Sequence, residues 1–147
     1  MPESPPDPQL AYKGSAVTKT TLLTSEQWRP SFTLAPGADR VGSMRGVAAG
    51  LQGQNFGLGL VLIPPGQQSP PHYYTGEHLF LQLRGATRFI VDDEEFIMRP
   101  MDSLFVPADV VYRYGSVGLE ESLFVNVIGR TDEWPAISHY PGFNQQS

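Results

Sequence analysis

Cysteine is absent from this chain of 147 residues. Disulfide bonds, zinc–thiolate centres and cysteine nucleophiles are therefore excluded, and a reducing compartment, the cytoplasm, is the expected location. Positive charge is also scarce, because ten Lys and Arg stand against 15 Asp and Glu and give a net charge of −5. A protein with this balance is not expected to bind nucleic acid or an anionic membrane.

Long apolar runs and amphipathic helical patterns are missing as well. The longest apolar stretch, near Leu58–Ile63, is far shorter than the roughly 20 residues of a membrane-spanning helix. The first residues, MPESPPDPQ, have neither the basic nor the apolar region of a signal peptide. There is no glycine-rich phosphate loop, G-x-S-x-G elbow or H-E-x-x-H motif, which disfavours nucleotide-dependent transfer and serine hydrolysis.

Glycine and proline, in contrast, are abundant, with 15 and 14 residues. They separate short β-rich segments that we predict to be strands, at 57–63, 78–83, 87–91, 95–98, 103–106, 110–114 and 122–128, with one more within 18–28. A hairpin turn is expected at Asp92-Asp93, and another turn near 115–118. Short strands at this regular spacing predict an all-β antiparallel sandwich or barrel.

The chain divides into three predicted parts. Residues 1–30 form an extended N-terminal arm, because four prolines with polar neighbours lie in the first 15 residues. Residues 31–130 form the barrel, and residues 131–147 form a C-terminal tail. We expect this tail to pack on the barrel through its aromatic residues Trp134, Tyr140 and Phe143.

Two spaced motifs lie within the barrel. In the first, Gly66 is followed after five residues by His72-Tyr73-Tyr74, after three more by His78 and after six more by Gly85. In the second, Pro107 precedes Asp109, Tyr112 and Ser116 at fixed offsets, and Met101 stands six residues before the proline. Fifteen residues separate the two motifs.

This section, from Gly66 to Ser116, resembles the cupin family. The resemblance implies a jelly-roll barrel, or double-stranded β-helix, of about six to eight strands, with an internal pocket and frequent dimerisation. We therefore expect a homodimer. The resemblance also implies a divalent metal on three histidines and a glutamate. Those four ligand positions fall on His72, Tyr74, His78 and Tyr112, and only His72 keeps its ligand type. Likewise, Met101 and Asp109 replace the glycines of the second motif.

The alternation of strand side chains extends this set of residues. If His78 points inward, so do Phe80 and Gln82, and if Tyr112 points inward, so does Tyr114. An apolar cavity with a few polar groups suits a small-molecule ligand or substrate. The candidate catalytic residues are His72, Tyr74, His78 and Tyr112, and the candidate substrate-binding residues are Phe80, Gln82, Tyr114 and Phe105.

Three functions remain open at this stage. The first is an oxygenase, lyase or isomerase with one divalent metal (Fe, Mn, Ni or Zn) on His72 and His78. A tyrosine is a poor third ligand, because its pKa is about 10 and the hydroxyl is therefore neutral at pH 7. The second is a metal-free isomerase or cyclase, in which an imidazole moves a proton while Tyr74 and Tyr112 stabilise an enolate oxygen. The third is a binding module without a reaction.

Structural roles compete with these functional ones. His78 could simply bond to a neighbouring group, and a buried Gln82 would need a hydrogen-bond partner. We interpret His139 as structural and the acidic run 92–95 as a solvated turn. Arg40, Arg45 and Arg88 could recognise an acidic substrate, although the sequence does not place them near the pocket.

Overall fold

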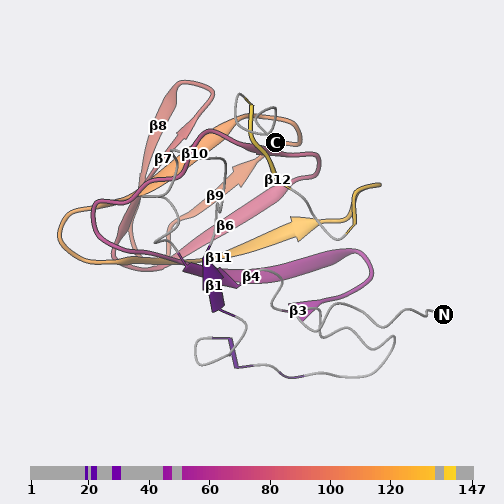
Figure 1. Cartoon of the computed structure of the whole chain (residues 1–147), viewed down its shortest axis with the longest axis horizontal. Helices are drawn as coiled ribbons and strands as arrows, with labels where there is room; N and C mark the ends of the chain where they lie inside the picture. Colours follow the sequence, from indigo (N-terminus) through magenta and orange to yellow (C-terminus); the bar gives the residue numbers. More distant parts are fainter. Residues whose placement is uncertain are drawn as a thin grey trace.

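The structure, a computed structural model, describes residues 19, 21–22, 28–30, 45–47, 51–134 and 138–141. Within these residues every regular element is a β-strand (Figure 1). The described part of the chain has no helix long and apolar enough to cross a membrane. The predicted arm lies largely outside the described residues, and Arg40 and Phe143 lie wholly outside them.

The larger of the two main sheets is antiparallel throughout. Its strands follow the spatial order β1, β2, β4, β11, β6, β9, and β3 also pairs with β4. The strands of this sheet are β1 (Trp28–Pro30), β2 (Arg45–Val47), β3 (Leu51–Gln52), β4 (Phe56–Ile63), β11 (Ser122–Gly129), β6 (His78–Arg84) and β9 (Ser103–Val106). The sheet thus already includes residues 28–30, which we had assigned to the arm, because β1 pairs with β2.

The second sheet contains β10 (Tyr112–Val117), β7 (Ala86–Val91) and β8 (Glu94–Met98), in that order. The segment 67–72 runs antiparallel along the free edge of β10 and forms bridges at Gln68 and His72. It continues into β5 (Tyr73–Tyr74), which pairs with β12 (Ser138–His139). The chain therefore turns from one sheet to the other immediately before His78.

The core lies between the two sheets. Val61, Phe80 and Phe124 come from the larger sheet, and Phe89 and Tyr114 come from the smaller one. Phe89 and Phe124 are fully buried, and each of these two rings packs edge-on or tilted against its neighbours. Two antiparallel sheets closed over one apolar core confirm the predicted all-β jelly-roll barrel.

The turns explain several residue choices in the two motifs. Asp92 and Asp93 both have positive φ, as a two-residue hairpin turn requires, and β7 pairs with β8 on either side of them. Met101 and Asp109 also have positive φ, of 75° and 66°. These two positions are the ones where the motif has glycine, so the backbone conformation is retained although the residue has changed.

Strand ends differ from the predicted ones mainly at β10. The sequence predicts a turn at 115–118, but β10 continues to Val117 because it is paired on both sides. It pairs with β7 through Val117, and with the segment 67–72 through Gln68 and His72. Gly115 allows this close approach, since a Cβ there would lie 2.7 Å from the Cβ of Gln68.

Candidate functional site

The structure brings three of the four candidate catalytic residues together inside the barrel, and the ring of the fourth lies beside them. His72 ends the segment that pairs with β10, Tyr74 is in β5, His78 begins β6 and Tyr112 begins β10. Their exposed fractions are 1%, 2%, 5% and 3%, respectively. The site is therefore a closed cluster of buried rings at one end of the core.

His72 is oriented by the backbone on both sides. Its own N–H and C=O pair with Tyr112, at 2.9 and 2.8 Å. Its ring Nδ1 lies 2.8 Å from the carbonyl oxygen of Pro70, which can only accept, so Nδ1 carries the proton. Burial lowers the pKa of His72 to about 4. Its Nε2 is therefore the acceptor atom of a neutral imidazole.

In His78, the ring nitrogen Nδ1 faces a hydroxyl group and not a carbonyl oxygen. The hydroxyl of Tyr112 lies 3.0 Å from Nδ1 of His78. A phenol is a much stronger acid than a neutral imidazole N–H, and on this ground we assign the hydroxyl as the donor and place the ring proton of His78 on Nε2. Burial lowers the pKa of His78 to about 3, and the positive charge that His72 gains on protonation acts in the same direction. In this assignment His78 is a neutral imidazole with its proton on Nε2.

Aromatic rings fill the space around the two imidazoles. The ring centroid of His72 lies 4.4 Å from that of Tyr112 and 5.4 Å from that of Tyr114. The ring of Phe80 lies 4.9 Å from that of His78. Burial raises the pKa of Tyr112 and of Tyr114 well above the ordinary value, so both remain phenols.

Tyr74 faces the cluster with its ring and not with its hydroxyl. Its ring lies 5.0 Å from that of His78. Its hydroxyl donates to the carbonyl oxygen of Gly129, at the end of β11, and burial raises its pKa. Tyr74 therefore packs against His78 and fixes the end of a strand, with its hydroxyl directed away from the imidazoles.

The four predicted substrate-binding residues do not share one location. Phe80 and Tyr114 line the interior beside the histidines. Gln82 is fully buried deeper in the barrel, where its amide donates to the carbonyl oxygens of Arg84 and Gly85. Phe105 is on the outer face and is 50% exposed, which corrects its predicted role. Since strand residues alternate, Val106 takes the inward position of β9 beside His78.

The donor set does not fit the metal centre that the family motif implies. Among the described residues, no three His, Cys, Asp or Glu side chains are placed to hold a metal ion together. The two remaining ligand positions are tyrosines that burial keeps as neutral phenols in the metal-free protein, and a neutral phenol is a poor ligand. Two neutral imidazoles alone are fewer than the three protein ligands of an ordinary catalytic site.

Tyr140 completes the cluster and was not among the candidate residues. Its ring lies 5.5 Å from that of His72, and it packs on the core from the C-terminal side. Burial raises its pKa to about 12. The sequence indicated only that the tail has aromatic residues, because nothing in the spacing shows that the tail returns to β5.

The tail is held at this end of the barrel by a small polar network. His139 stacks on Tyr73 with ring centroids 5.0 Å apart, and its Nε2 lies 2.8 Å from Glu133. This hydrogen bond lowers the pKa of Glu133, which also accepts from Thr75. His139 therefore anchors β12, the strand that directly precedes Tyr140.

Residues 59–128 match the family model described as "Cupin domain". Among curated proteins, the chain is 29% identical over 84 residues to "Polyketide synthase CurC" of Streptomyces cyaneus. This match covers 56% of the chain and 54% of the relative, so the chain spans about half of the relative's length.

Solved structures show the same fold at low sequence identity. The DMSP lyase DddQ from Ruegeria pomeroyi DSS-3 superposes with a TM-score of 0.64 at 18% identity, covering 76% of this chain and 59% of the lyase. A cupin superfamily protein from Desulfitobacterium hafniense DCB-2 has a TM-score of 0.55 at 19% identity, covering 70% of this chain and 95% of its own.

Proposed function

The chain belongs to the cupin superfamily, and we propose that its barrel interior binds a small molecule and moves a proton beside a carbonyl group. The reaction class is that of an isomerase, cyclase or lyase. The observation that supports it is the buried pair of imidazoles with different partners at Nδ1, the carbonyl oxygen of Pro70 for His72 and the hydroxyl of Tyr112 for His78. In our assignment of the ring protons, Nε2 of His72 is the unprotonated nitrogen, whereas Nε2 of His78 carries the proton.

Enolisation needs these two groups at the same time. One atom must take the proton from the carbon beside the carbonyl, and a donor must stabilise the oxygen that becomes negative. In the proposal His72 is the base and the Nε2–H of His78 is the donor. Tyr112 holds His78 in the donating tautomer through its hydrogen bond to Nδ1, so Tyr112 acts as a positioning residue.

The proposed reaction balances without a further reactant. The C–H bond beside one carbonyl breaks and its proton moves to Nε2 of His72. The resulting enolate carbon forms a bond to a second carbonyl carbon of the same molecule, whose oxygen becomes an alkoxide. The proton on His72 then moves to that alkoxide. The product is a cyclic hydroxyketone with the same atoms as the substrate, and the imidazole is regenerated.

The substrate class that we propose is a molecule with several carbonyl groups. The relative named as a polyketide synthase supports this choice, since polyketide chains contain repeated ketones. The aromatic wall formed by Phe80, Tyr112 and Tyr114 is chemically suited to the planar, partly conjugated enol forms of such a molecule.

The interior has to open before a substrate reaches the imidazoles, because His72 and His78 are 1% and 5% exposed. Tyr140 is the ring against His72 that comes from the C-terminal segment, next to the two-residue strand β12. So short a strand has few backbone hydrogen bonds to hold it. We therefore propose that Tyr140 moves aside when the substrate binds.

A cyclisation assay tests the proposed function. A linear triketone with one aromatic end would be incubated with the protein, and ring formation followed by absorbance and mass spectrometry. We expect His72→Gln and Tyr112→Phe to lower the rate by about 100-fold and 10-fold, respectively. Tyr73→Phe is the matched control, because this tyrosine stacks on His139 outside the cluster.

The outcomes separate the alternatives that the sequence leaves open. Saturable binding of the triketone without conversion would indicate that the protein is a binding module and not an enzyme. Conversion that is unaffected by both His72→Gln and Tyr112→Phe would place the reaction elsewhere in the molecule. Circular dichroism of each variant shows whether a lost rate reflects a lost fold.

We also propose that two copies of the chain associate through the outer face of the larger sheet. Leu79 and Phe105 are neighbours on this face and are 51% and 50% exposed. Val127 lies opposite Leu79 on the adjacent strand, so the apolar surface extends across the sheet. Strands that are apolar on both faces are typical of a sheet covered on both sides, and an exposed apolar patch can meet its own copy around a two-fold axis.

A further inference from the structure

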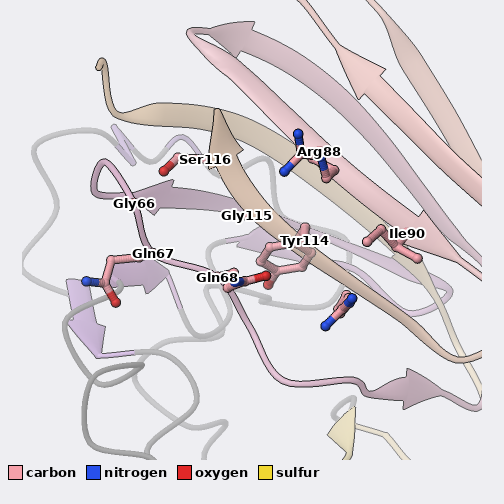
Figure 2. A pocket seen from close by; sticks show the side chains of 9 residues that line it. Gly66, Gln67, Gln68, Arg88, Ile90, Tyr114, Gly115 and Ser116 are labelled. Carbon is pink, nitrogen blue, oxygen red and sulfur yellow. The ribbon is translucent and has the colours of Figure 1, made fainter. Parts of the chain in front are cut away.

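A groove lies on the outer face of the smaller sheet. Its volume is about 220 Å³, and it is lined by Gly66, Gln67, Gln68, Arg88, Ile90, Arg113, Tyr114, Gly115 and Ser116. Figure 2 shows the segment with Gln67 and Gln68 running beside the strand that carries Gly115, with Arg88 and Ile90 on the next strand. At about 30 Å³ per water molecule, the groove has room for roughly seven waters.

Because residue 115 has no side chain, the segment with Gln67 and Gln68 can lie close against β10 at this groove. A Cβ at Gly115 would lie 2.7 Å from the Cβ of Gln68 and 3.0 Å from the carbonyl oxygen of Gln67. The hydroxyl of Ser116 is already used, since it donates to the carbonyl oxygen of Pro64. The polar groups that remain to face a ligand are therefore those of the glutamines and arginines.

Two positive charges border this groove. Arg88 pairs with Gly115 across β7 and β10, and Arg113 pairs with Ile90, so both arginines lie on the outward face of adjacent strands. Arg88 also forms an ion pair with Glu95, at 3.0 Å. Arg113 is in none of the ion pairs between described residues, although Asp92 and Asp93 line a neighbouring cavity with it.

We propose that this groove binds a compact oxyanion, either a carboxylate or a phosphate group. Arg113 supplies the main charge, Arg88 supplies a second one that it shares with Glu95, and the side-chain amides of Gln67 and Gln68 donate further hydrogen bonds. Guanidinium groups match both kinds of oxyanion because their N–H groups form a planar fork. The limited volume selects small anions or the charged end of a longer molecule.

An NMR titration of the full chain tests this site. Uniformly ¹⁵N-labelled protein would be titrated with sodium phosphate and separately with sodium succinate, at constant pH and ionic strength, with sodium chloride as the blank. We expect saturable shifts at the backbone amides of 66–68 and 113–116, with half-saturation at about millimolar concentration. The anion that binds with the higher affinity indicates whether the natural group is a phosphate or a carboxylate.

Charge variants decide whether the arginines carry the binding. We expect Arg113→Gln to weaken it by about tenfold and Arg88→Gln by about threefold. Arg84→Gln is the matched control, because Arg84 is also an exposed arginine in an ion pair, with Glu121, but it lies outside the groove. The proposal is overturned by shifts that do not saturate below about 50 mM, by equal shifts with chloride, or by unchanged affinity in Arg113→Gln.

Discussion

The hydroxyl of Tyr112 and Nδ1 of His78, 3.0 Å apart, join the two sheets of the barrel by a hydrogen bond between buried side chains. Because the hydroxyl donates, the bond also determines which ring nitrogen of His78 carries the proton. Tyr112 thereby links the packing of the core to the chemistry of the imidazole.

Removal of that hydroxyl should change the tautomer of His78 more than the fold. We expect Tyr112→Phe to lower the free energy of unfolding by about 1–2 kcal/mol, because it leaves a buried acceptor without its donor. The ¹⁵N shifts of His78 should show a mixture of tautomers, whereas those of His72 should not move. Unchanged shifts of His78 would mean that the hydroxyl does not determine the tautomer.

Acid should destabilise the fold through the two buried histidines. Their pKa values are lowered to about 4 and about 3, whereas an unfolded histidine has a pKa of 6.5. The unfolded chain therefore binds more protons as the pH falls below about 6.5, and stability is lost towards the folded values. At pH 5 each histidine should cost on the order of 2 kcal/mol.

Urea unfolding at pH 7, 6 and 5 measures this effect. The variant His78→Gln should show a smaller loss of stability between pH 7 and 5 than the parent. His139→Gln should retain the full loss due to His72 and His78, because His139 is a partly exposed residue outside the cluster. An equal pH dependence in the parent and in His78→Gln would contradict the explanation.

Shortening of Tyr140 should expose His72. We expect Tyr140→Ala to increase the rate at which diethyl pyrocarbonate modifies His72 by about tenfold, since the ring against it is lost. Tyr140→Phe keeps the ring and should react like the parent. If Tyr140→Ala also reacts like the parent, then another part of the chain covers His72.

The ligand types of the family motif should be sufficient to create a metal site. We expect the triple variant Tyr74→His, His78→Glu, Tyr112→His to bind one equivalent of Zn²⁺ or Ni²⁺, measured by elemental analysis after dialysis. The parent, with two imidazoles and two neutral phenols, should retain less than about a tenth of an equivalent. If the parent contains one equivalent of metal and His72→Gln loses it, then the metal-dependent function predicted from the sequence is the correct one.

Charge on the outer face of the larger sheet should prevent association. We expect the parent to be a dimer by light scattering and Leu79→Glu to be a monomer, because two like charges would meet at the two-fold axis. Leu119→Glu is the control, since Leu119 is 95% exposed and lies in the turn after β10. A monomeric parent at micromolar concentration would remove the proposed interface.

The barrel was predictable because its signals are local. Strand alternation and turn residues depend on neighbours in the sequence, so seven strands and the Asp92-Asp93 hairpin follow from them. The inward positions of Phe80 and Tyr114 follow from the same alternation. Phe105 was misplaced although alternation also applies to it, because the register of β9 against His78 is not visible in the sequence.

The contacts of the candidate site depend on residues far apart in the chain. The hydroxyl of Tyr74 meets Gly129, 55 positions away, and Tyr140 packs on His72 from the C-terminal tail. No local pattern encodes either contact. The same is true of Arg113, which faces the groove only because segment 67–72 lies along β10.

The position of β11 in the larger sheet has a consequence for folding. This strand lies between β4 and β6, yet it follows both of them in the chain by many residues. The hairpin of β7 and β8 can form early because its contacts are short in sequence, whereas the centre of the larger sheet must wait for a distant strand. Until then β4 and β6 each have an unpaired edge beside apolar faces, which is the form in which a β-protein aggregates. Folding of this barrel should therefore be slow, and chaperones should improve its yield.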